Sequence, residues 1–440
     1  MAKVRMSSRD IITLTLLVAM SAFFFADQRI MTAIIKELSI EYGVSESVIG
    51  YIGSAFMLIG AFISIVFGYL TDKVSRKWLL VATVVIGEIP CLMTGFKVFT
   101  QTIESFTILR ILTGIGIGGV YPICYSLIAD YFREEHRPTA TAWVNVAWMI
   151  GMVAGPVMAG FLTNTYGWRF PFIVAALPGF PVVILFALYA KDPERGRTEA
   201  ALEDLIQKGL TYKQKIKFSD FKVLFTNKTN IWMFLQSLPG TVPWGILGYW
   251  MIHFLEKSKG MSKEASTLVF LLLGGGATVG GIVFAYIGEW LYKKNPKYLP
   301  ILCGTFVLLG IIPAVALVNV PLGAGGIGIG AFYVLSFVTG FMVAVATANA
   351  KAITMNVNRP EHRGSIFALY NISDNIGQGF GPAIGGALIG FGYTFMMNFA
   401  LPFWLVCGAF LFVVARYITA DRDALQKYLK DQAEEMKKRL

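Results

Sequence analysis

The sequence predicts an all-α integral membrane protein with twelve transmembrane helices, arranged as two pseudo-symmetric six-helix bundles. Three observations lead to this fold class: an apolar composition, twelve apolar stretches of membrane-spanning length, and an internal repeat. The chain of 440 residues is 55% hydrophobic and 15% charged, and its mean hydropathy is +0.62. Soluble domains are far less apolar, so the composition indicates a polytopic membrane protein.

A membrane-spanning helix needs about 20 mostly apolar residues. Twelve such stretches are expected at residues 11–35, 48–70, 78–98, 103–129, 137–163, 171–190, 229–252, 264–288, 298–318, 327–352, 364–390 and 395–416. The basic lead and apolar run at the start also imitate a signal peptide. No small-residue cleavage site follows, so the first stretch is interpreted as the first span.

The second half of the chain repeats the first. Residues 133–162 align without a gap to 359–388 with 12 identities in 30 positions, where chance gives about two. Residues 65–77 match 282–294 in the same way. The repeat predicts four parts: a six-helix bundle at 1–190, a cytoplasmic linker at 191–228, a second bundle at 229–418, and a cytoplasmic tail at 419–440.

Charge placement predicts the orientation. If both termini are cytoplasmic, 29 of the 38 Lys and Arg residues lie on that side and 7 on the other, as the positive-inside rule requires. We therefore expect a multi-pass protein with cytoplasmic termini, in the cell membrane. The net charge of +11 is scattered over short loops, which argues against a nucleic-acid partner.

Three motifs carry a resemblance to a known family. "GYLTDKVSRK" lies between the second and third spans, "RILTGIGIGG" opens the fourth, and "GMVAGPVMAG" in the fifth is echoed by "GPAIGG" in the eleventh. Over essentially its whole length the chain resembles the major facilitator superfamily. The stretch beginning "FFFADQRIMTAIIKELS" also resembles the Spinster lipid transporters and related organic-anion symporters, which place an Asp and Arg pair late in helix one.

The resemblance implies a charged cytoplasmic gate between the second and third helices. A carboxylate and bases there would link helix ends in one state and separate in another. The gating set is Gly68, Asp72, Arg76, Lys77, Asp130 as the partner of Arg76, and Glu289 as the repeat equivalent of Asp72. The alternative interpretation is a solvated loop that simply obeys the positive-inside rule.

Small residues and prolines recur in the fifth and eleventh helices. Glycines four residues apart, Gly151 and Gly155, let helix backbones approach closely, and Gly381 repeats the pattern. Pro156 and Pro382 each remove a backbone hydrogen bond and permit a kink. These features suit bundles that rock against each other, although tight helix packing alone would also explain each glycine.

Ionisable residues inside spans are costly and are therefore candidates for function. They are Asp27, Arg29, Glu88, Arg110, Lys351 and Asp374. At a rise of about 1.5 Å per residue, Asp27 lies roughly 24 Å up a 30 Å core and Arg110 about 10 Å below the outer side, which are similar depths. In the family that the chain resembles, helices one, four, seven and ten line the central cavity. We therefore expect Asp27 and Arg110 to face each other across it.

The expected substrate-binding side chains combine these charges with aromatic rings. They are Asp27, Arg29, Arg110, Tyr121, Trp143, Trp244 and Tyr370. Arg29 could instead snorkel to the outer interface, and the aromatic rings could belong to lipid-facing belts. The expected proton carriers are Asp27, Glu88 and Asp374, because a buried carboxylate can hold a proton.

The sequence predicts a secondary active transporter that works by alternating access. No GxxxxGK[ST] loop exists to supply ATP energy, so an ion gradient, of protons by expectation, should drive it as a symporter or an antiporter. We expect an amphipathic organic anion or lysolipid-like substrate; the alternatives are a proton-driven exporter of lipophilic cations and, remotely, a non-transporting receptor or scaffold. No enzyme, cofactor or metal site is expected. The expected partners are the lipid bilayer, a small amphipathic substrate and protons, with the protein a monomer.

Overall fold

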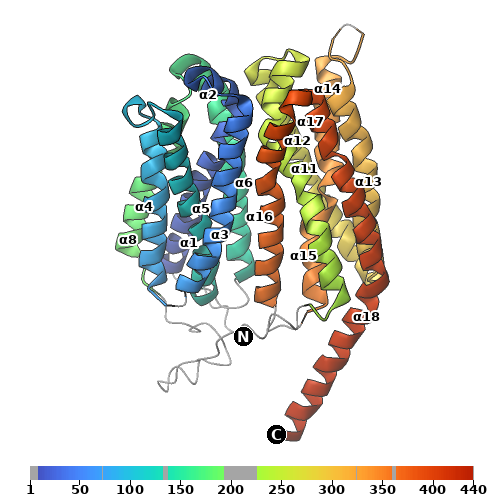
Figure 1. The fold of residues 1–440 in the computed structure, drawn as a ribbon. Helices are drawn as coiled ribbons and strands as arrows, with labels where there is room; N and C mark the ends of the chain where they lie inside the picture. The colour runs from blue at the N-terminus through green and yellow to red at the C-terminus, as the bar shows by residue number, and fades with distance from the viewer. Residues whose placement is uncertain are drawn as a thin grey trace. The chain divides into compact units, whose positions relative to one another are not determined.

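The structure, a computed structural model, describes residues 8–71, 73–131, 137–192, 225–323, 325–358 and 363–439. The chain divides into two compact units, Met1–Lys215 and Ile216–Leu440, so the division falls inside the expected linker. Each unit is a bundle of α-helices (Figure 1).

The helices of the first unit are α1 (Ser8–Gln28), η1 (Ile30–Ala33), α2 (Ile35–Tyr42), α3 (Glu46–Thr71), α4 (Arg76–Thr94), η2 (Lys97–Phe99), α5 (Ile103–Tyr131), α6 (Arg137–Tyr166), α7 (Phe170–Ala176) and α8 (Gly179–Tyr189). Those of the second unit are α11 (Lys228–Lys259), α12 (Lys263–Lys294), α13 (Tyr298–Asn319), α14 (Ile329–Val343), α15 (Val345–Asn356), α16 (Arg363–Leu388), η5 (Ile389–Phe391), α17 (Tyr393–Ala400) and α18 (Pro402–Arg439).

Each of the twelve expected spans corresponds to one helix or to a pair of consecutive helices. Within the described residues, eight helical segments are long and apolar enough to cross a membrane by length and composition. The helices α6, α11 and α16 are also of spanning length, at 30, 32 and 26 residues, but they carry more glycine, proline and polar side chains. Membrane helices tolerate such residues where they pack against other helices.

Four expected spans are interrupted rather than continuous. The first ends at Gln28, because the chain turns at Arg29, whose carbonyl accepts hydrogen bonds from the backbone N–H and the hydroxyl of Thr32. The sixth breaks before Gly179 at a proline, which has no N–H to continue the helix. The tenth divides between α14 and α15, and the twelfth between α17 and α18.

Local sequence signals fix the corner between α11 and α12. The side chain of Asn227 accepts a hydrogen bond from the backbone N–H of Asn230 and caps the start of α11. The same helix ends at Gly260, whose φ of 65° lies in the left-handed region that glycine adopts without steric cost. Ser262 then caps α12. Only residues 260–262 separate the two helices, and a connection this short makes them an antiparallel pair.

The two units use the same packing scheme, as the internal repeat predicts. In the first unit α1 packs along α6, and α5 packs along α3 and α4. In the second unit α11 packs along α16, and α14 packs along α12 and α13. The first and fifth spans of each half are therefore partners, as are the second and fourth.

The repeated glycines lie at the contact between the first and fifth spans of each half. A Cβ on Gly155 of α6 would lie 2.0 Å from the carbonyl oxygen of Ala26 on α1, and one on Gly151 would lie 2.3 Å from that of Ala22. A Cβ on Gly381 of α16 would lie 2.3 Å from the carbonyl carbon of Gly245 on α11. No larger residue fits these contacts without moving the backbone of a neighbouring helix.

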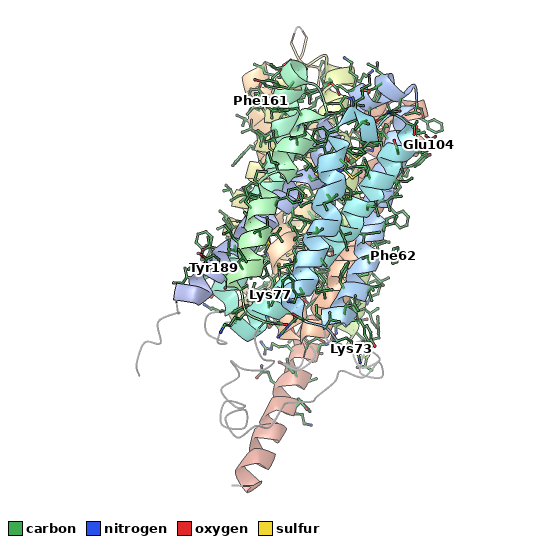
Figure 2. The ribbon with its side chains drawn as sticks, turned by 90° about the vertical axis from the view of Figure 1, so that its left-hand side faces the viewer. Phe62, Lys73, Lys77, Glu104, Phe161 and Tyr189 are labelled. Carbon is green, nitrogen blue, oxygen red and sulfur yellow. The ribbon has the colours of Figure 1, made fainter. Side chains whose placement is uncertain are left out.

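Figure 2 shows how polar and apolar side chains divide over the first unit. Lys73 and Lys77 lie at one end of the helices, and Glu104 lies at the other. Phe62 projects from the helices between these ends, Phe161 lies at the same end as Glu104, and the two are 57% and 50% exposed. Exposed aromatic side chains on the flank of a bundle suit contact with lipid rather than with water.

The glycine contacts predict a steric effect with a matched control. We expect Gly155→Ala to lower the free energy of unfolding by about 1–3 kcal/mol, because the new methyl group must push α1 away. Gly275→Ala, at a position on α12 where a Cβ meets nothing within 4 Å, should be neutral or slightly stabilising. Thermal unfolding in detergent micelles measures both, and equal effects would contradict the packing role of Gly155.

Candidate substrate and coupling site

A buried ion pair between α1 and α5 is the main polar feature of the first unit. Nη1 of Arg110 donates hydrogen bonds to both carboxylate oxygens of Asp27, at 2.8 and 3.0 Å. Arg110 is 1% exposed and Asp27 is 3% exposed. The sequence places the two residues at similar depth, and the structure brings them into direct contact rather than across a cavity.

Two threonine hydroxyls accept hydrogen bonds from the second terminal nitrogen of the guanidinium, whereas its Nε has no hydrogen-bond partner among the described residues. Nη2 of Arg110 donates to Oγ1 of Thr94 at 2.8 Å and to Oγ1 of Thr113 at 3.3 Å. Each hydroxyl in turn donates to a carbonyl oxygen of its own helix, four residues earlier. The hydroxyl lone pairs therefore face the cation. Nothing in the sequence singled these threonines out, because a threonine in a span is common and only the contact with Arg110 distinguishes them.

Aromatic rings flank the cation. The guanidinium carbon of Arg110 lies 4.6 Å from the ring centroid of Phe172 on α7 and 6.0 Å from that of Phe106 on α5. Both distances suit a cation–π contact. A charged group that is held between apolar rings fits a ligand with an anionic head and an apolar or aromatic body.

Glu88 is a second buried carboxylate beside the ion pair. It is 3% exposed, and its Oε1 accepts no hydrogen bond from any residue that the structure describes. Asp27 and Arg110 are both within electrostatic range of it. The first unit therefore holds two buried carboxylates near one buried guanidinium.

Removing one partner of the ion pair should destabilise the protein more than removing both partners. We expect Arg110→Met to lower the free energy of unfolding by about 3–5 kcal/mol at pH 7, because it leaves Asp27 buried without its cation. The double variant Asp27→Leu/Arg110→Met should recover most of that loss, since an apolar pair of similar volume replaces the buried charges. Denaturation in detergent micelles measures both, and equal losses in the single and double variants would rule out this origin.

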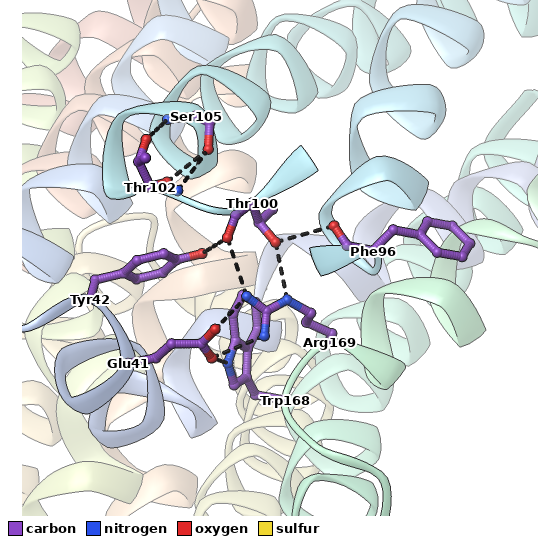
Figure 3. Close-up of polar contacts among 8 residues, drawn as sticks. All are labelled: Glu41, Tyr42, Phe96, Thr100, Thr102, Ser105, Trp168 and Arg169. Carbon is purple, nitrogen blue, oxygen red and sulfur yellow. Dashed lines mark hydrogen bonds and ion pairs between the residues drawn. The ribbon is translucent and has the colours of Figure 1, made fainter. Parts of the chain in front are cut away.

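A polar cluster at the Glu104 end of the first unit was not expected from the sequence. Figure 3 shows Arg169, just before α7, reaching Glu41 on α2: Nη2 donates to Oε1 at 2.6 Å and Nη1 to Oε2 at 2.9 Å. Trp168 also donates its indole N–H to Glu41. The Arg169 guanidinium donates further hydrogen bonds to the side chain and the carbonyl of Thr100. No short motif signals such a cluster, because its members come from three segments of the chain, around residues 41, 100 and 168, that are more than 50 residues apart.

This cluster is joined to the ion pair by aromatic contacts. The indole of Trp168 packs edge-on against Phe106 and Phe172, at centroid distances of 5.8 and 6.1 Å. These are the two rings that flank Arg110. The hydrogen bonds between Glu41, Trp168 and Arg169 therefore help to position the aromatic rings that pack next to Arg110.

The carboxyl group of Glu41 has a pKa below its ordinary value. Partial burial acts to raise this pKa, but hydrogen bonds from Arg169 and Trp168 and the charge of Arg169 outweigh it. The contribution of Glu41 to stability is therefore fully present above the pKa of an unfolded glutamate and is lost as pH falls through the lowered pKa.

Glu41→Gln should show this pH dependence. We expect the wild type to be more stable than the variant by up to about 1 kcal/mol at pH 7, a small value because the pair is partly solvated. The difference should shrink as pH falls below about 4.3, the pKa of a free glutamate, because both proteins then lack the charge. A difference in unfolding temperature that stays constant from pH 7 to pH 3 would contradict the assignment.

The second unit has its own buried polar cluster, which includes two of the expected site residues. The Gln236 amide on α11 donates to the Tyr370 hydroxyl on α16 at 2.8 Å, and Ser237 donates to Ser373 at 2.5 Å. Asp374 lies on α16 one turn after Tyr370, and its Oδ1 accepts no hydrogen bond from the described residues. Tyr370 is 4% exposed. The structure therefore brings Tyr370 and Asp374 to one place but does not join them to Trp244.

The other expected substrate-binding residues are dispersed. Tyr121 stacks with Tyr125 and makes a tilted contact with Phe25, Trp244 packs edge-on against Trp404, and Trp143 is 55% exposed. Arg29 is 5% exposed, so it does not extend to an interface as the snorkelling alternative required. These aromatic side chains lie apart from the Asp27–Arg110 pair in the contacts that the structure gives.

The expected gating residues are described only in part. Asp72 and the side chain of Asp130 lie outside the described residues, so the expected pairing of Arg76 with Asp130 stays a prediction. Arg76 is 4% exposed; its Nη1 donates to the carbonyl of Ser126 on α5 at 3.4 Å, and its Nε lies 3.6 Å from Asp192. Glu289 is exposed and pairs with Lys293 at 2.6 Å.

The remaining members of the expected gate are Gly68 and Lys77. A Cβ on Gly68 would meet only Pro122, at 3.9 Å, so this glycine is not required by close packing. The ammonium of Lys77 lies 4.9 Å from the ring centroid of Trp78. All four cysteines are free and buried, and no group of three or more metal-ligating side chains occurs among the described residues.

The family is decided by a comparison of the sequence with family models. The model of the Major Facilitator Superfamily matches residues 16–333 and 321–437, which together span nearly the whole chain. The chain belongs to the major facilitator superfamily. It is therefore a multi-pass integral membrane protein of a transporter family and not a member of an enzyme family.

Two relatives illustrate what the sequence is similar to. The cis,cis-muconate transport protein of Acinetobacter baylyi is 26% identical over 274 residues, which cover 61% of this chain and 64% of that protein. Protein spinster homolog 1 of Xenopus tropicalis is 24% identical over 431 residues, covering 90% of this chain and 79% of that protein. The sequence thus resembles both transporters of organic acids and Spinster proteins.

The fold is similar to that of a solved Spinster protein. A crystal structure of a bacterial homolog of the human lysosomal transporter Spinster, inward-facing and unoccupied, superposes with a TM-score of 0.81. The two chains are 19% identical, and the match covers 94% of this chain and 99% of the other. At this identity the similarity shows the twelve-helix fold, and it leaves the substrate open.

Proposed function

We propose that this protein is a proton-coupled secondary transporter of organic anions that works by alternating access. The observation that carries the proposal is the buried pair of Asp27 and Arg110, with two threonine hydroxyls and two aromatic rings around the guanidinium. Ionisable residues inside a membrane bundle are retained for function because they are expensive to bury. Arg110 is the cation that an anionic substrate would seek.

The proposed coupling between the anion and a proton follows from charge balance at Asp27 and Arg110. A guanidinium can bind a carboxylate or phosphate through two parallel hydrogen bonds; here a single nitrogen, Nη1, donates to both carboxylate oxygens of Asp27. A substrate anion that takes this place leaves Asp27 buried without a counter-charge. Asp27 then binds a proton, because a bare carboxylate in an apolar interior costs several kcal/mol. One proton therefore enters the site with each substrate charge, which is symport.

The surroundings of Arg110 select an anion with an apolar body. Phe106 and Phe172 offer ring faces beside the charge, and Thr94 and Thr113 offer hydroxyl groups. Relatives of this chain include proteins named as transporters of benzoate, gentisate and sphingosine-1-phosphate, which all join an acidic head to an apolar part. Small aromatic carboxylates and lysolipid phosphates are the two substrate classes that fit.

The second candidate is a proton-driven exporter of lipophilic cations. It is favoured by Asp374 in the second unit, where one carboxylate oxygen is buried without a hydrogen-bond donor. In the first unit Asp27 is already neutralised by Arg110, so that unit offers a cation little attraction.

We also propose that both termini are cytoplasmic, that the protein acts as a monomer in the cell membrane, and that Asp72, Arg76 and Asp130 gate its cytoplasmic side.

Ligand-induced stabilisation of the purified protein tests the proposal, since a ligand that binds the folded state raises the unfolding temperature. We expect benzoate, cis,cis-muconate or sphingosine-1-phosphate to stabilise the wild type, and tetraphenylphosphonium to have no effect. The matched control is the folded Asp27→Leu/Arg110→Met variant, which should lose the response to anions. Stabilisation by tetraphenylphosphonium that Asp374→Asn abolishes would favour the cation exporter instead.

A further inference from the structure

We infer that Glu88 is a proton relay between Asp27 and the Arg76 end of α4. This inference rests on the proposed function, because it concerns how the proton that accompanies the anion leaves Asp27. It goes further by assigning one carboxylate, a route and a direction. Glu88 is the fitting residue because it is nine-tenths buried, lies beside the ion pair, and has an oxygen without a hydrogen-bond partner among the described residues.

The position of Glu88 along α4 defines the route. Thr94, which accepts a hydrogen bond from Arg110, lies six residues after Glu88, about 9 Å along the helix axis. Cys91 lies between them; its thiol donates to the carbonyl of Phe172 and is close enough to Asp27 to interact with its carboxylate. Glu88 therefore lies one turn below the level of Asp27, on the side of the α4 start at Arg76. The proposed orientation makes that side cytoplasmic.

The local structure lets Glu88 exist in both protonation states. A Cβ on Gly179, the first residue of α8, would lie 2.8 Å from Oε1 of Glu88, so the carboxylate is packed against the start of that helix. The first N–H groups of a helix have no carbonyl partner within it, and its positive dipole end favours an anion. The surrounding apolar burial favours the neutral acid. The two effects oppose each other, as a group that takes up and releases protons requires.

The charges around Glu88 are few and can be named from each element packed against α4. Helix α1 contributes Asp27, and α5 contributes Arg110. Helix α7 has no titratable residue, α8 has only the exposed Tyr189, and η2 has only Lys97, beyond the Thr94 end of α4. Helix α3, which touches α4 less, has Glu46, Tyr51 and Tyr69. One guanidinium thus lies near two carboxylates. When Arg110 is paired with Asp27, Glu88 has no cation of its own and carries the exchangeable proton.

The transfer is balanced in charge and atoms. When the substrate leaves Arg110, the guanidinium pairs again with Asp27, whose O–H bond breaks. The released proton forms a new O–H bond on Glu88 while Glu88 gives its own proton to water on the Arg76 side. With one substrate charge bound, Arg110, protonated Asp27 and protonated Glu88 balance to zero, and after the anion and one proton have left, Arg110, ionised Asp27 and protonated Glu88 again sum to zero, so no unpaired carboxylate remains in the apolar interior. Without Glu88 the proton would have to return through the outer side, and the coupling would fail.

The first test separates net transport from exchange. In proteoliposomes, wild type should accumulate cis,cis-muconate when the outside is more acidic, and should exchange labelled for unlabelled muconate at equal pH. Exchange needs no net proton movement. We expect Glu88→Gln to lose at least tenfold in accumulation and to keep exchange within about threefold of the wild type, because an amide cannot relay a proton.

Two glycine variants provide a matched steric pair. Gly179→Ala inserts a methyl group against Oε1 of Glu88 and should slow accumulation several-fold while sparing exchange. Gly274→Ala, where a Cβ meets nothing within 4 Å, should change neither rate. If Gly179→Ala and Gly274→Ala behave alike, or if Glu88→Gln accumulates muconate as fast as the wild type, the relay is refuted. Loss of accumulation in Asp374→Asn but not in Glu88→Gln would place the relay in the second unit.

The second test needs no substrate, so it separates failure of the relay from failure of the proposed function. A pH-induced infrared difference spectrum of the purified protein should contain a protonated-carboxyl band that Glu88→Gln removes and that Asp27→Asn shifts. Such a band would support the relay even if muconate is not carried. Identical spectra for the wild type and Glu88→Gln would overturn the relay even if the anion is transported.

Discussion

The cost of holding charge inside an apolar bundle is the constraint on which this structure depends. Arg110 is 1% exposed, and the described contacts of its guanidinium are Asp27, two threonine hydroxyls and two aromatic rings. A site of this kind is stable only while its charges balance. In the proposed mechanism an anion that takes the place of Asp27 brings a proton with it, so the proposed coupling rests on the same charge balance that stabilises the pair of Asp27 and Arg110.

The fold supplies the rigidity that this balance needs. Glycines in the fifth span of each half let it contact the first span at backbone distance, at Gly155 against α1 and at Gly381 against α11. Asp27 directly follows the Ala26 carbonyl that Gly155 touches. At the Glu104 end of the first unit, the pair of Glu41 and Arg169 lies beside Trp168, whose ring packs against the two phenylalanines next to Arg110. The position of the ion pair is thus fixed from two sides.

The sequence predicted the architecture well because hydropathy and repetition are local signals. The twelve spans follow from hydropathy within windows of about 20 residues, and the correspondence between helices of the two halves follows from an alignment of 30 residues. The depth argument also put Asp27 and Arg110 at one level, because helical rise is regular. The sequence did not predict the helix breaks at Arg29 and before Gly179, because these depend on turn geometry. It also did not predict the cluster around Arg169, because the members of that cluster come from three distant segments. The threonines at Arg110 could not be predicted either, since only tertiary contact distinguishes them from other threonines.

The central claim is that Arg110 exchanges Asp27 for a substrate anion and that a proton enters with it. The most direct measurement is the number of protons taken up when benzoate binds the purified protein in weakly buffered detergent solution near neutral pH. The account predicts uptake of about one proton per benzoate in the wild type, and none in Asp27→Asn. Binding that requires Arg110 but takes up no proton in the wild type would contradict it.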